Sequence, residues 1–436
     1  MRTNNLENYW LPFTNNRDFK KDSRIIRSAE GMYYTSDDGR AILDGSAGLW
    51  CVNAGHKHPV IIDGIMRAVQ TLDYAPGFNF AHDGVFELSN RLADLFPESL
   101  NHFFFANSGS EAVDSALKIA LAYQRTRGKG TKTRLIGRER GYHGVGFGGI
   151  SVGGMVKNRM HFGSLLTGVD HMRHTHDPSR NRYTDGEVEH GAELADDLER
   201  LVMLHDASNI AAVIVEPISG STGVLPPPKG YLKRLRKICD KHDILLIFDE
   251  VISAFGRLGT TTAAEYFGVE PDLITFAKGL TNGVIPMSGV AVRDEIYQSM
   301  VDNADAPIEL FHGYTYSGHP VATAAAMATL DAYEQDDMFN RSRQIAAHWS
   351  KCAHALKGAP HVTDIRTIGL IAGIELESRS GALGWRAHDA MKLAWERGLL
   401  LRVTGDIMAF SPPLIISEQE VSYLFDTVSA ILQDLE

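Results

Sequence analysis

The sequence predicts an α/β protein with a mostly parallel sheet in a large domain and a smaller α+β lobe from both chain ends. The chain has 436 residues, and a single core rarely grows past about 250–300 residues, so we expect two lobes. Its middle alternates short apolar runs with amphipathic helical patterns. The apolar runs lack polar alternation, which is typical of parallel strands covered by helices on both faces.

The central elements follow from hydrophobic spacing. One helical face of the 193–205 segment carries Leu194, Leu198, Leu201 and Val202. The stretch 171–191 is polar and turn-rich and is interpreted as a long loop, whose four histidines lack the spacing of metal ligands. The spacing predicts helices over 111–124, 193–205 and 231–242, and strands over 210–217, 244–251, 272–277 and 287–292.

The two ends of the chain differ from the middle. The pattern of residues 31–45 predicts a hairpin with its turn at Asp38 and Gly39. A last helix is expected to begin at Ser417, because Glu420 completes a capping box. Between them we expect a helix over 319–334, a strand over 367–377 and a helix over 388–398. The expected division is an N-terminal arm and part of the small domain at 1–65, a large α/β domain at 66–315 and a C-terminal small domain at 320–436.

Composition excludes several classes of protein. The formal charge is -11, from 43 Lys+Arg against 54 Asp+Glu, which disfavours nucleic acid and anionic membranes as partners. No apolar run approaches the length of a membrane span, and the N-terminus lacks the apolar region of a signal peptide. Cys51, Cys239 and Cys352 are far apart and fit no metal site. We therefore expect reduced thiols and a cytoplasmic location.

Three ionisable residues lie at the carboxyl ends of predicted strands. Glu216, Asp249 and Lys278 each end an apolar run, and function in open α/β sheets sits at the carboxyl ends of strands. An acid and an amine are costly to bury unpaired. A buried Asp–Lys salt bridge would explain Asp249 and Lys278 structurally, but such bridges contribute little to stability. We interpret the pair as functional.

Two further stretches indicate a ligand. The strand before Asn107 breaks at Ser108, Gly109 and Ser110, and a helix begins at once, so its free N–H groups favour an anion such as phosphate. Ser108 or Ser110 could equally be a plain N-cap. Tyr142 and His143 stand between glycines, where a ring can lie on a flat ligand or simply form a turn.

One ligand would use all of these groups. Pyridoxal phosphate has an aldehyde for an amine, a ring nitrogen for an acid, a flat ring and a phosphate. The stretch "LLIFDEVISAFGRLGTTTAAEYFGVEPDLITFAKGLTNG" (245–283) resembles class III pyridoxal-phosphate aminotransferases, and the resemblance covers nearly the whole chain. The stretches "NHFFFANSGSEA", "IGRERGYHGV", "GVLPPPKGYLKRLR" and "HGYTYSGHPVA" are most similar to omega-amino acid–pyruvate, or β-alanine–pyruvate, aminotransferases.

The resemblance implies the type I pyridoxal-phosphate transferase fold and a role for each matched residue. Lys278 would hold the cofactor covalently and act as general base and acid, and Asp249 would pair with the ring nitrogen. Thr315 matches a residue that reaches the phosphate of the neighbouring subunit, which implies a homodimer with shared sites and leaves open a tetramer. The expected cofactor-binding residues are Ser108, Gly109, Ser110, Tyr142, His143, Glu216, Asp249, Val251, Lys278 and Thr315.

The same resemblance addresses the substrate. Phe13, Trp50 and Phe78 match aromatic pocket walls, although a tryptophan among small residues is more often part of a core. Arg402 matches an arginine that binds the substrate carboxylate, a task suited to its planar fork. Relatives that prefer β-alanine tend to have glutamine where this chain has Ala409. The expected substrates are therefore an omega-amino acid or a more apolar amine, together with a keto acid.

The expected reaction moves the amino group of such an amine to pyruvate. It would give an aldehyde or ketone and L-alanine in a ping-pong mechanism through pyridoxamine phosphate. The alternative is a 4-aminobutyrate or ornithine-type enzyme that uses 2-oxoglutarate, which needs a further cation for the second carboxylate. A cofactor-binding regulator without turnover would normally carry a nucleic-acid module, and the acidic chain shows none.

Overall fold

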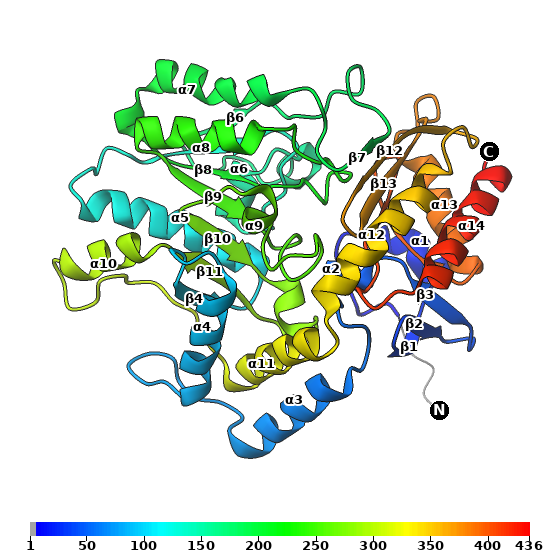
Figure 1. Cartoon of the computed structure of the whole chain (residues 1–436), viewed down its shortest axis with the longest axis horizontal. Coiled ribbons are helices and arrows are strands. Elements are labelled where there is room, and N and C mark those ends of the chain that lie inside the picture. The colour runs from blue at the N-terminus through cyan, green and yellow to red at the C-terminus, as the bar shows by residue number, and fades with distance from the viewer. Residues whose placement is uncertain (1–5) are drawn as a thin grey trace.

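The computed structural model describes residues 6–436 and shows two lobes side by side (Figure 1). The larger lobe is built on a seven-stranded sheet in which β11 alone runs antiparallel to its neighbours. The predicted α/β class with a mostly parallel sheet is therefore confirmed. In sheet order the strands are β4 (His102–Ala106), β11 (Ser288–Val292), β10 (Leu273–Phe276), β9 (Leu245–Asp249), β8 (Ile210–Val215), β5 (Arg134–Arg138) and β6 (Val169–Met172).

Helices cover both faces of this sheet because its strands are apolar on both sides. In β9, Leu245 and Ile247 pack in one buried cluster, whereas Leu246 and Phe248 pack in the other. Side chains alternate across a strand, so each set meets its own layer of helices. One layer contains α5 (Gly109–Thr126) and α10 (Asp294–Asp302), and the other contains α7 (Asp197–His205) and α8 (Tyr231–His242).

The smaller lobe contains two sheets formed by distant parts of the chain. Residues from the N-terminal region and from near the C-terminus share the four-stranded sheet, which includes the predicted hairpin around Asp38 and Gly39. That sheet is β1 (Ile26–Glu30), β2 (Tyr33–Ser36), β3 (Ala41–Asp44) and β14 (Leu399–Leu400). The five-stranded sheet is β15 (Arg402–Thr404), β16 (Ile407–Phe410), β13 (Ile371–Leu376), β12 (Val362–Ile368) and β7 (Thr184–Asp185).

Two predictions about these segments are wrong in detail. The single strand expected over 367–377 is a hairpin, because Gly369 adopts a φ of +52° and turns the chain between β12 and β13. A side chain there would also meet the carbonyl oxygen of Arg257 at 2.5 Å. The loop expected over 171–191 contains the end of β6 and the short strand β7, which extends the small-lobe sheet beside β12. The predicted domain limits stay a prediction.

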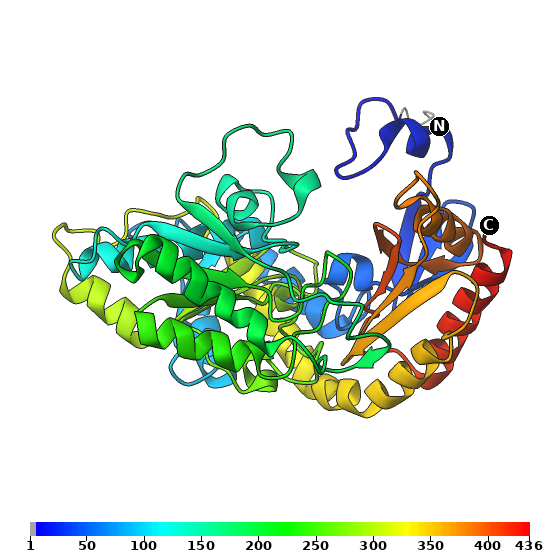
Figure 2. The ribbon, with the colours of Figure 1, turned by 90° about the horizontal axis from the view of Figure 1, so that it is seen from above.

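Long helices connect and cover the lobes (Figures 1 and 2). The predicted capping box of the last helix is confirmed, since Ser417 and Glu420 bond reciprocally. In Figure 2 the N-terminal arm stands away from the larger lobe.

Within residues 6–436 no helix is long and apolar enough to cross a membrane. The remaining α-helices are α1 (Asn16–Lys21), α2 (Ala47–Trp50), α3 (Pro59–Thr71), α4 (Asp83–Leu95), α6 (Phe147–Val152), α9 (Ala263–Phe267), α11 (Pro320–Gln335), α12 (Met338–His354), α13 (Trp385–Glu396) and α14 (Glu418–Asp434).

Candidate active site

Three neighbouring parallel strands bring the ionisable strand ends to one edge of the large sheet. Strands β8, β9 and β10 are adjacent and parallel. Glu216 follows β8, Asp249 ends β9, and Lys278 opens a short 3-10 turn, Lys278–Thr281, just after β10. The charges of Asp249 and Glu216 both raise the pKa of Lys278, against the larger lowering effect of burial. The structure thus brings together the three residues that the sequence singled out.

Three hydrogen bonds fix the carboxylate of Asp249. Nδ1 of His143 lies 2.8 Å from Oδ2. The hydroxyl of Thr275 and the N–H of Val251 donate to Oδ1 at 3.1 and 3.2 Å. Sequence reasoning missed Thr275, although its hydroxyl is the one polar group in the apolar run of β10, and it pairs in register with Asp249 across the sheet. A carboxylate with so many partners holds one orientation.

Glu216 is 4% exposed, and two backbone groups bind its carboxyl. The N–H of Tyr142 donates to Oε1 at 2.9 Å, and the N–H of Gly220 donates to Oε2 at 3.1 Å. Burial raises the pKa of Glu216 to about 7, and the nearby charge of Asp249 contributes to the rise, whereas His143 opposes it. Burial therefore raises the pKa of a carboxyl that accepts the backbone N–H of Tyr142.

Lys278 carries an amine without a partner. Among residues 6–436, no group forms a hydrogen bond or an ion pair with its Nζ. Burial lowers its pKa, and the positive charge of Arg402 lowers it further, whereas Cys51 raises it. Its backbone adopts a φ of +47°, an uncommon conformation for a residue other than glycine. A free amine with a lowered pKa is suited to attack a carbonyl.

Groups that sequence reasoning missed hold the turn that presents Lys278. The hydroxyl of Tyr333 donates to the carbonyl oxygen of Gly279 at 2.5 Å. Any side chain at Gly279 would lie 2.6 Å from Nδ2 of Asn53, so this glycine is required by close packing. The side chain of Asn282 bonds the backbone of Ala54 and Gly55, both at 2.8 Å. These contacts are between segments far apart in sequence, which no local pattern reveals.

The first turn of α5 offers free backbone donors. Ser108 is the N-cap, and its hydroxyl accepts the N–H of Glu111 at 3.3 Å, as the capping interpretation predicts. The N–H groups of Gly109 and Ser110 meet no acceptor within residues 6–436. A side chain at Gly109 would approach Cγ1 of Val251 to 2.9 Å. The predicted anion site therefore has two free donors beside Val251, at the positive end of a long helix.

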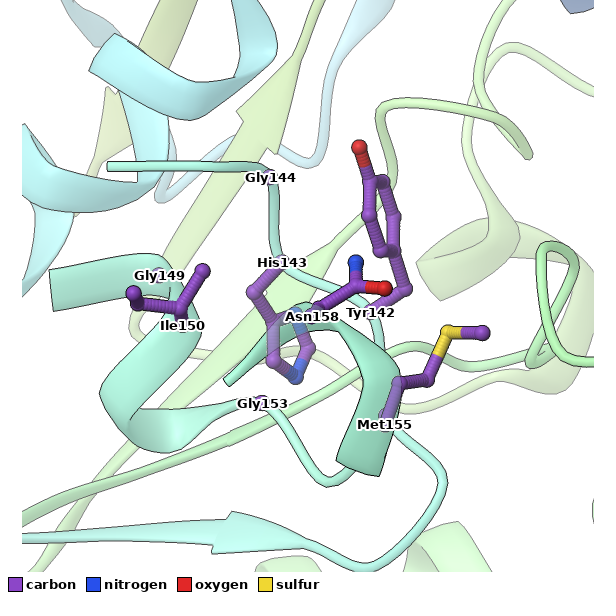
Figure 3. Close-up of a pocket in the computed structure, with 9 residues that line it drawn as sticks. Tyr142, His143, Gly144, Gly149, Ile150, Gly153, Met155 and Asn158 are labelled. Atoms are coloured by element: carbon purple, nitrogen blue, oxygen red, sulfur yellow. The ribbon is translucent and has the colours of Figure 1, made fainter. Parts of the chain in front are cut away.

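Tyr142 and His143 are neighbours in the chain but point in opposite directions (Figure 3). His143 is 1% exposed and reaches Asp249. Tyr142 is half-buried, and burial raises the pKa of its phenol, while the charge of Arg402 opposes that rise. Gly144 (φ +84°) fits here because a side chain would collide with Ser110. The glycines on either side thus let the chain carry one ring to the carboxylate and present the other toward Arg402.

Arg402 begins β15 and pairs in register with Ala409 of β16. Its half-buried guanidinium has no hydrogen bond or ion pair within the described part of the chain. Burial lowers its pKa. A guanidinium that is withdrawn from water without a partner is costly, so the site is arranged for a ligand that brings negative charge.

The three aromatic residues expected to form pocket walls differ in their exposure to solvent. Trp50 is 2% exposed and packs in the core, whereas Phe13 and Phe78 are 81% and 56% exposed. Thr315 is also exposed. In residues 6–436 no hydrogen bond, ion pair or ring contact joins Phe13, Phe78 or Thr315 to Lys278. The pocket roles of these residues stay predictions.

The residues present fit one cofactor. An unpaired amine, a fixed carboxylate at a strand end, and two free N–H groups match the aldehyde, ring nitrogen and phosphate of pyridoxal phosphate. Glycines at 109 and 144 keep this cradle open, since side chains there would fill it. Fold and site together therefore define a pyridoxal-phosphate enzyme.

The comparisons with known proteins make the class specific. The family model Aminotransferase class-III matches residues 15–432. The chain is 59% identical to an omega-aminotransferase of Caulobacter vibrioides, covering 99% of both chains, and 49% identical to a β-alanine–pyruvate aminotransferase of Pseudomonas aeruginosa, covering 99% of this chain and 96% of the relative. An amine transaminase from an uncultivated Pseudomonas species, solved in its PLP-bound form, superposes with a TM-score of 0.92 at 32% identity over 100% of each chain.

The chain belongs to the class III aminotransferases. It is a pyridoxal-phosphate-dependent transaminase whose substrates are small molecules.

Proposed function

We propose that this transaminase moves the amino group of an omega-amino acid or related amine to pyruvate, giving an aldehyde or ketone and L-alanine. The observation that carries the proposal is the unpaired guanidinium of Arg402, whose charge acts on both Lys278 and Tyr142. It provides one binding point for a substrate carboxylate beside the reactive amine. Relatives named as omega-aminotransferase and β-alanine–pyruvate aminotransferase support the same reaction.

The chain's own residues divide the chemistry among them. When bound, pyridoxal phosphate supplies an aldehyde that captures amines and a ring that withdraws electrons from the substrate carbon. Asp249, fixed by His143 and Thr275, would hold the proton on the ring nitrogen. The Nζ of Lys278 would take the proton from the substrate carbon and return it, which its lowered pKa favours. Gly109 and Ser110 would bind the phosphate, while Tyr142 and Val251 would enclose the ring.

Arg402 would bind the two kinds of substrate differently. Pyruvate and alanine carry a carboxylate next to the reacting carbon, whereas an omega-amino acid carries it further out and a simple amine has none. Ala409 lies directly opposite Arg402 in the β15–β16 pair and is 3% exposed. Its methyl group adds no polar contact beside the guanidinium, so the pocket accepts longer or more apolar amines.

A 2-oxoglutarate enzyme would need a second cation for the second carboxylate. Within the described residues, Arg402 is the only cation whose charge shifts the pKa of Tyr142. Arg140, two residues before Tyr142, is half-buried, but its charge acts on His174 and His176. This distribution of charge supports a monocarboxylate acceptor.

We also propose a homodimer whose active sites are completed by the partner chain. Large exposed aromatic patches commonly mark protein interfaces. Here Thr315 lies in the same surface region as Phe78, since a side chain at Gly313 would touch the Phe78 ring. The most exposed aromatic residues are Trp10 at 88%, Phe13 at 81%, Phe80 at 70% and Phe311 at 91%.

The free thiols of all three cysteines support a reducing compartment such as the cytoplasm.

A donor and acceptor panel tests the proposed reaction. Purified holoenzyme is assayed with β-alanine, 4-aminobutyrate, a diamine and an arylalkylamine, each against pyruvate and 2-oxoglutarate. We expect turnover with pyruvate for every accepted donor, and little turnover with 2-oxoglutarate. Faster turnover with 2-oxoglutarate would replace this proposal with the 4-aminobutyrate or ornithine-type activity.

A further inference from the structure

The loop that carries Thr315 is tied to helix α5 of its own chain. Nε2 of His312 lies 2.9 Å from the hydroxyl oxygen of Ser115. The hydroxyl of Ser115 donates its hydrogen to the carbonyl oxygen of Glu111 at 2.7 Å. Because a hydroxyl has one hydrogen, His312 must donate from Nε2 and Ser115 must accept. We call this contact the His312–Ser115 clamp.

Ring contacts reinforce the clamp. The ring of His312 stacks on Phe104 with the centroids 5.3 Å apart and the planes 13° apart. Phe104 belongs to β4, the strand that leads into the first turn of α5. The hydroxyl of Tyr314 donates to the carbonyl oxygen of Glu111 at 3.4 Å. The loop therefore contacts both the strand and the helix that form the predicted phosphate site.

Hydrogen bonds to the backbone of Thr315 and Gly318 also fix the C-terminal part of the loop. The hydroxyl of Tyr74 donates to the carbonyl oxygen of Thr315 at 3.2 Å, and Nε2 of His82 donates to that of Gly318 at 2.7 Å. Between these anchors Thr315 is exposed, and its hydroxyl has no partner within residues 6–436. The loop is fixed at both ends, and the Thr315 hydroxyl at its tip is free to bind a group outside the chain.

Helix α5 therefore contributes both to the predicted phosphate site and to the His312–Ser115 clamp. Its first turn presents the free N–H groups of Gly109 and Ser110, and Ser115 lies five residues further along, or about 7.5 Å at 1.5 Å per residue. His312 lies three residues before Thr315 in the same loop, and within residues 6–436 neither His312 nor Ser115 bonds to Lys278. The clamp therefore links the chain's own predicted phosphate site to the exposed loop that carries Thr315.

We propose that His312 is a positioning residue that acts across the dimer: through Ser115 it sets Thr315 against the phosphate bound in the partner subunit. The inference rests on the proposed dimer and on the proposed role of Thr315. Loss of the clamp weakens cofactor retention in the opposite subunit, while the site of the altered chain keeps its own retention. Loss of one hydrogen bond, about 1 kcal/mol, corresponds to roughly fivefold faster cofactor release.

His312→Phe tests the clamp, because phenylalanine keeps the stacking on Phe104 and removes the hydrogen bond. Ser115→Ala removes the same bond from the helix side. Thr126→Ala is the matched control, since its hydroxyl donates to a carbonyl four residues back on the same helix at 2.9 Å. Cofactor release is followed by loss of the visible absorbance of lysine-bound pyridoxal phosphate, and sedimentation checks the assembly. We expect faster release for both clamp variants and unchanged release for the control.

Mixed dimers assign the effect to a subunit. A Lys278→Ala subunit has no lysine-bound cofactor, so only its partner gives a signal. We expect fast release when His312→Phe is on the Lys278→Ala subunit, and parental release when it is on the other subunit. The reverse pattern, or parental release in both, overturns the inference. Thr315→Ala separates the causes: if it too leaves release unchanged, the proposed role of Thr315 fails, whereas faster release leaves only the clamp refuted.

Discussion

Nδ1 of His143 lies 2.8 Å from Oδ2 of Asp249, and the two residues are 1% and 7% exposed. The carboxylate is therefore not a free charge at the strand end but one member of a buried hydrogen-bonded pair. Thr275 bonds the other oxygen at 3.1 Å. Because both oxygens are anchored, the orientation of Asp249 is set before any ligand arrives, which is the pre-organisation that electrostatic catalysis requires.

Asp249→Asn should damage turnover far more than cofactor capture. An amide cannot hold a proton on the ring nitrogen, whereas Lys278 keeps its free amine. We expect turnover to fall well beyond tenfold, which is about 1.4 kcal/mol, with the visible absorbance of bound cofactor retained. Stopped-flow kinetics measure the first quantity and spectroscopic titration the second. Turnover within tenfold of the parent would show that Asp249 is not the ring partner.

Glu216→Gln should change the pH dependence of stability. Burial raises the pKa of Glu216 from 4.5 to about 7, so the folded apoprotein binds more protons than the unfolded chain between these values. Stability then falls as pH rises through that window. The variant lacks this loss, so its free energy of unfolding relative to the parent should rise from pH 5 to pH 8 by up to about 3 kcal/mol.

Urea unfolding of both apoproteins at several pH values measures this difference. The Glu216→Gln variant would also lose one of the two backbone hydrogen bonds, but that cost is independent of pH. A difference that stays flat across the range would mean that Glu216 is ionised throughout.

Arg402→Ala should separate the two halves of the reaction. Removing one partner of a buried charged pair costs about 2–5 kcal/mol, so the half-reaction with pyruvate should slow thirtyfold or more. The half-reaction with an amine lacking a carboxylate should change little. Single-turnover spectra follow each half separately. Equal losses in both halves would indicate that Arg402 supports the pocket, and that the carboxylate is bound elsewhere.

The holoprotein should sediment as a dimer or a larger assembly. Trp10, Phe13 and Phe311 are exposed aromatic residues of the kind that protein interfaces cover, and within residues 6–436 the Thr315 hydroxyl has no partner. Analytical ultracentrifugation at micromolar concentration measures the mass. A stable monomer with full activity would contradict the shared site.

The sequence predicts well where function depends on the order of elements. Apolar runs locate β8, β9 and β10, and parallel neighbours necessarily bring Glu216, Asp249 and Lys278 to one edge. Helix α8 and the capping box of α14 also agree with prediction, since 3.6-residue spacing and the Ser417–Glu420 pair are local signals. The α/β class follows from the same local patterns.

Contacts between distant segments are beyond such reasoning. The bond from Thr275 to Asp249 depends on strand register, and the packing of Asn53 on Gly279 depends on how the lobes dock. Gly369 does carry a local signal for the turn between β12 and β13, but apolar residues on both sides obscure it. Trp50 shows the remaining difficulty, because a core and a pocket wall require the same residue type.

The central claim is that Lys278 is the residue that binds the cofactor. Borohydride reduction of the holoenzyme fixes pyridoxal phosphate to whichever amine holds it, and peptide mapping by mass spectrometry then locates the label. We predict a single phosphopyridoxyl group on Lys278, in the peptide that contains "TFAKGLTNG". A label on any other lysine, with Lys278 unmodified, would contradict the assignment of the active site.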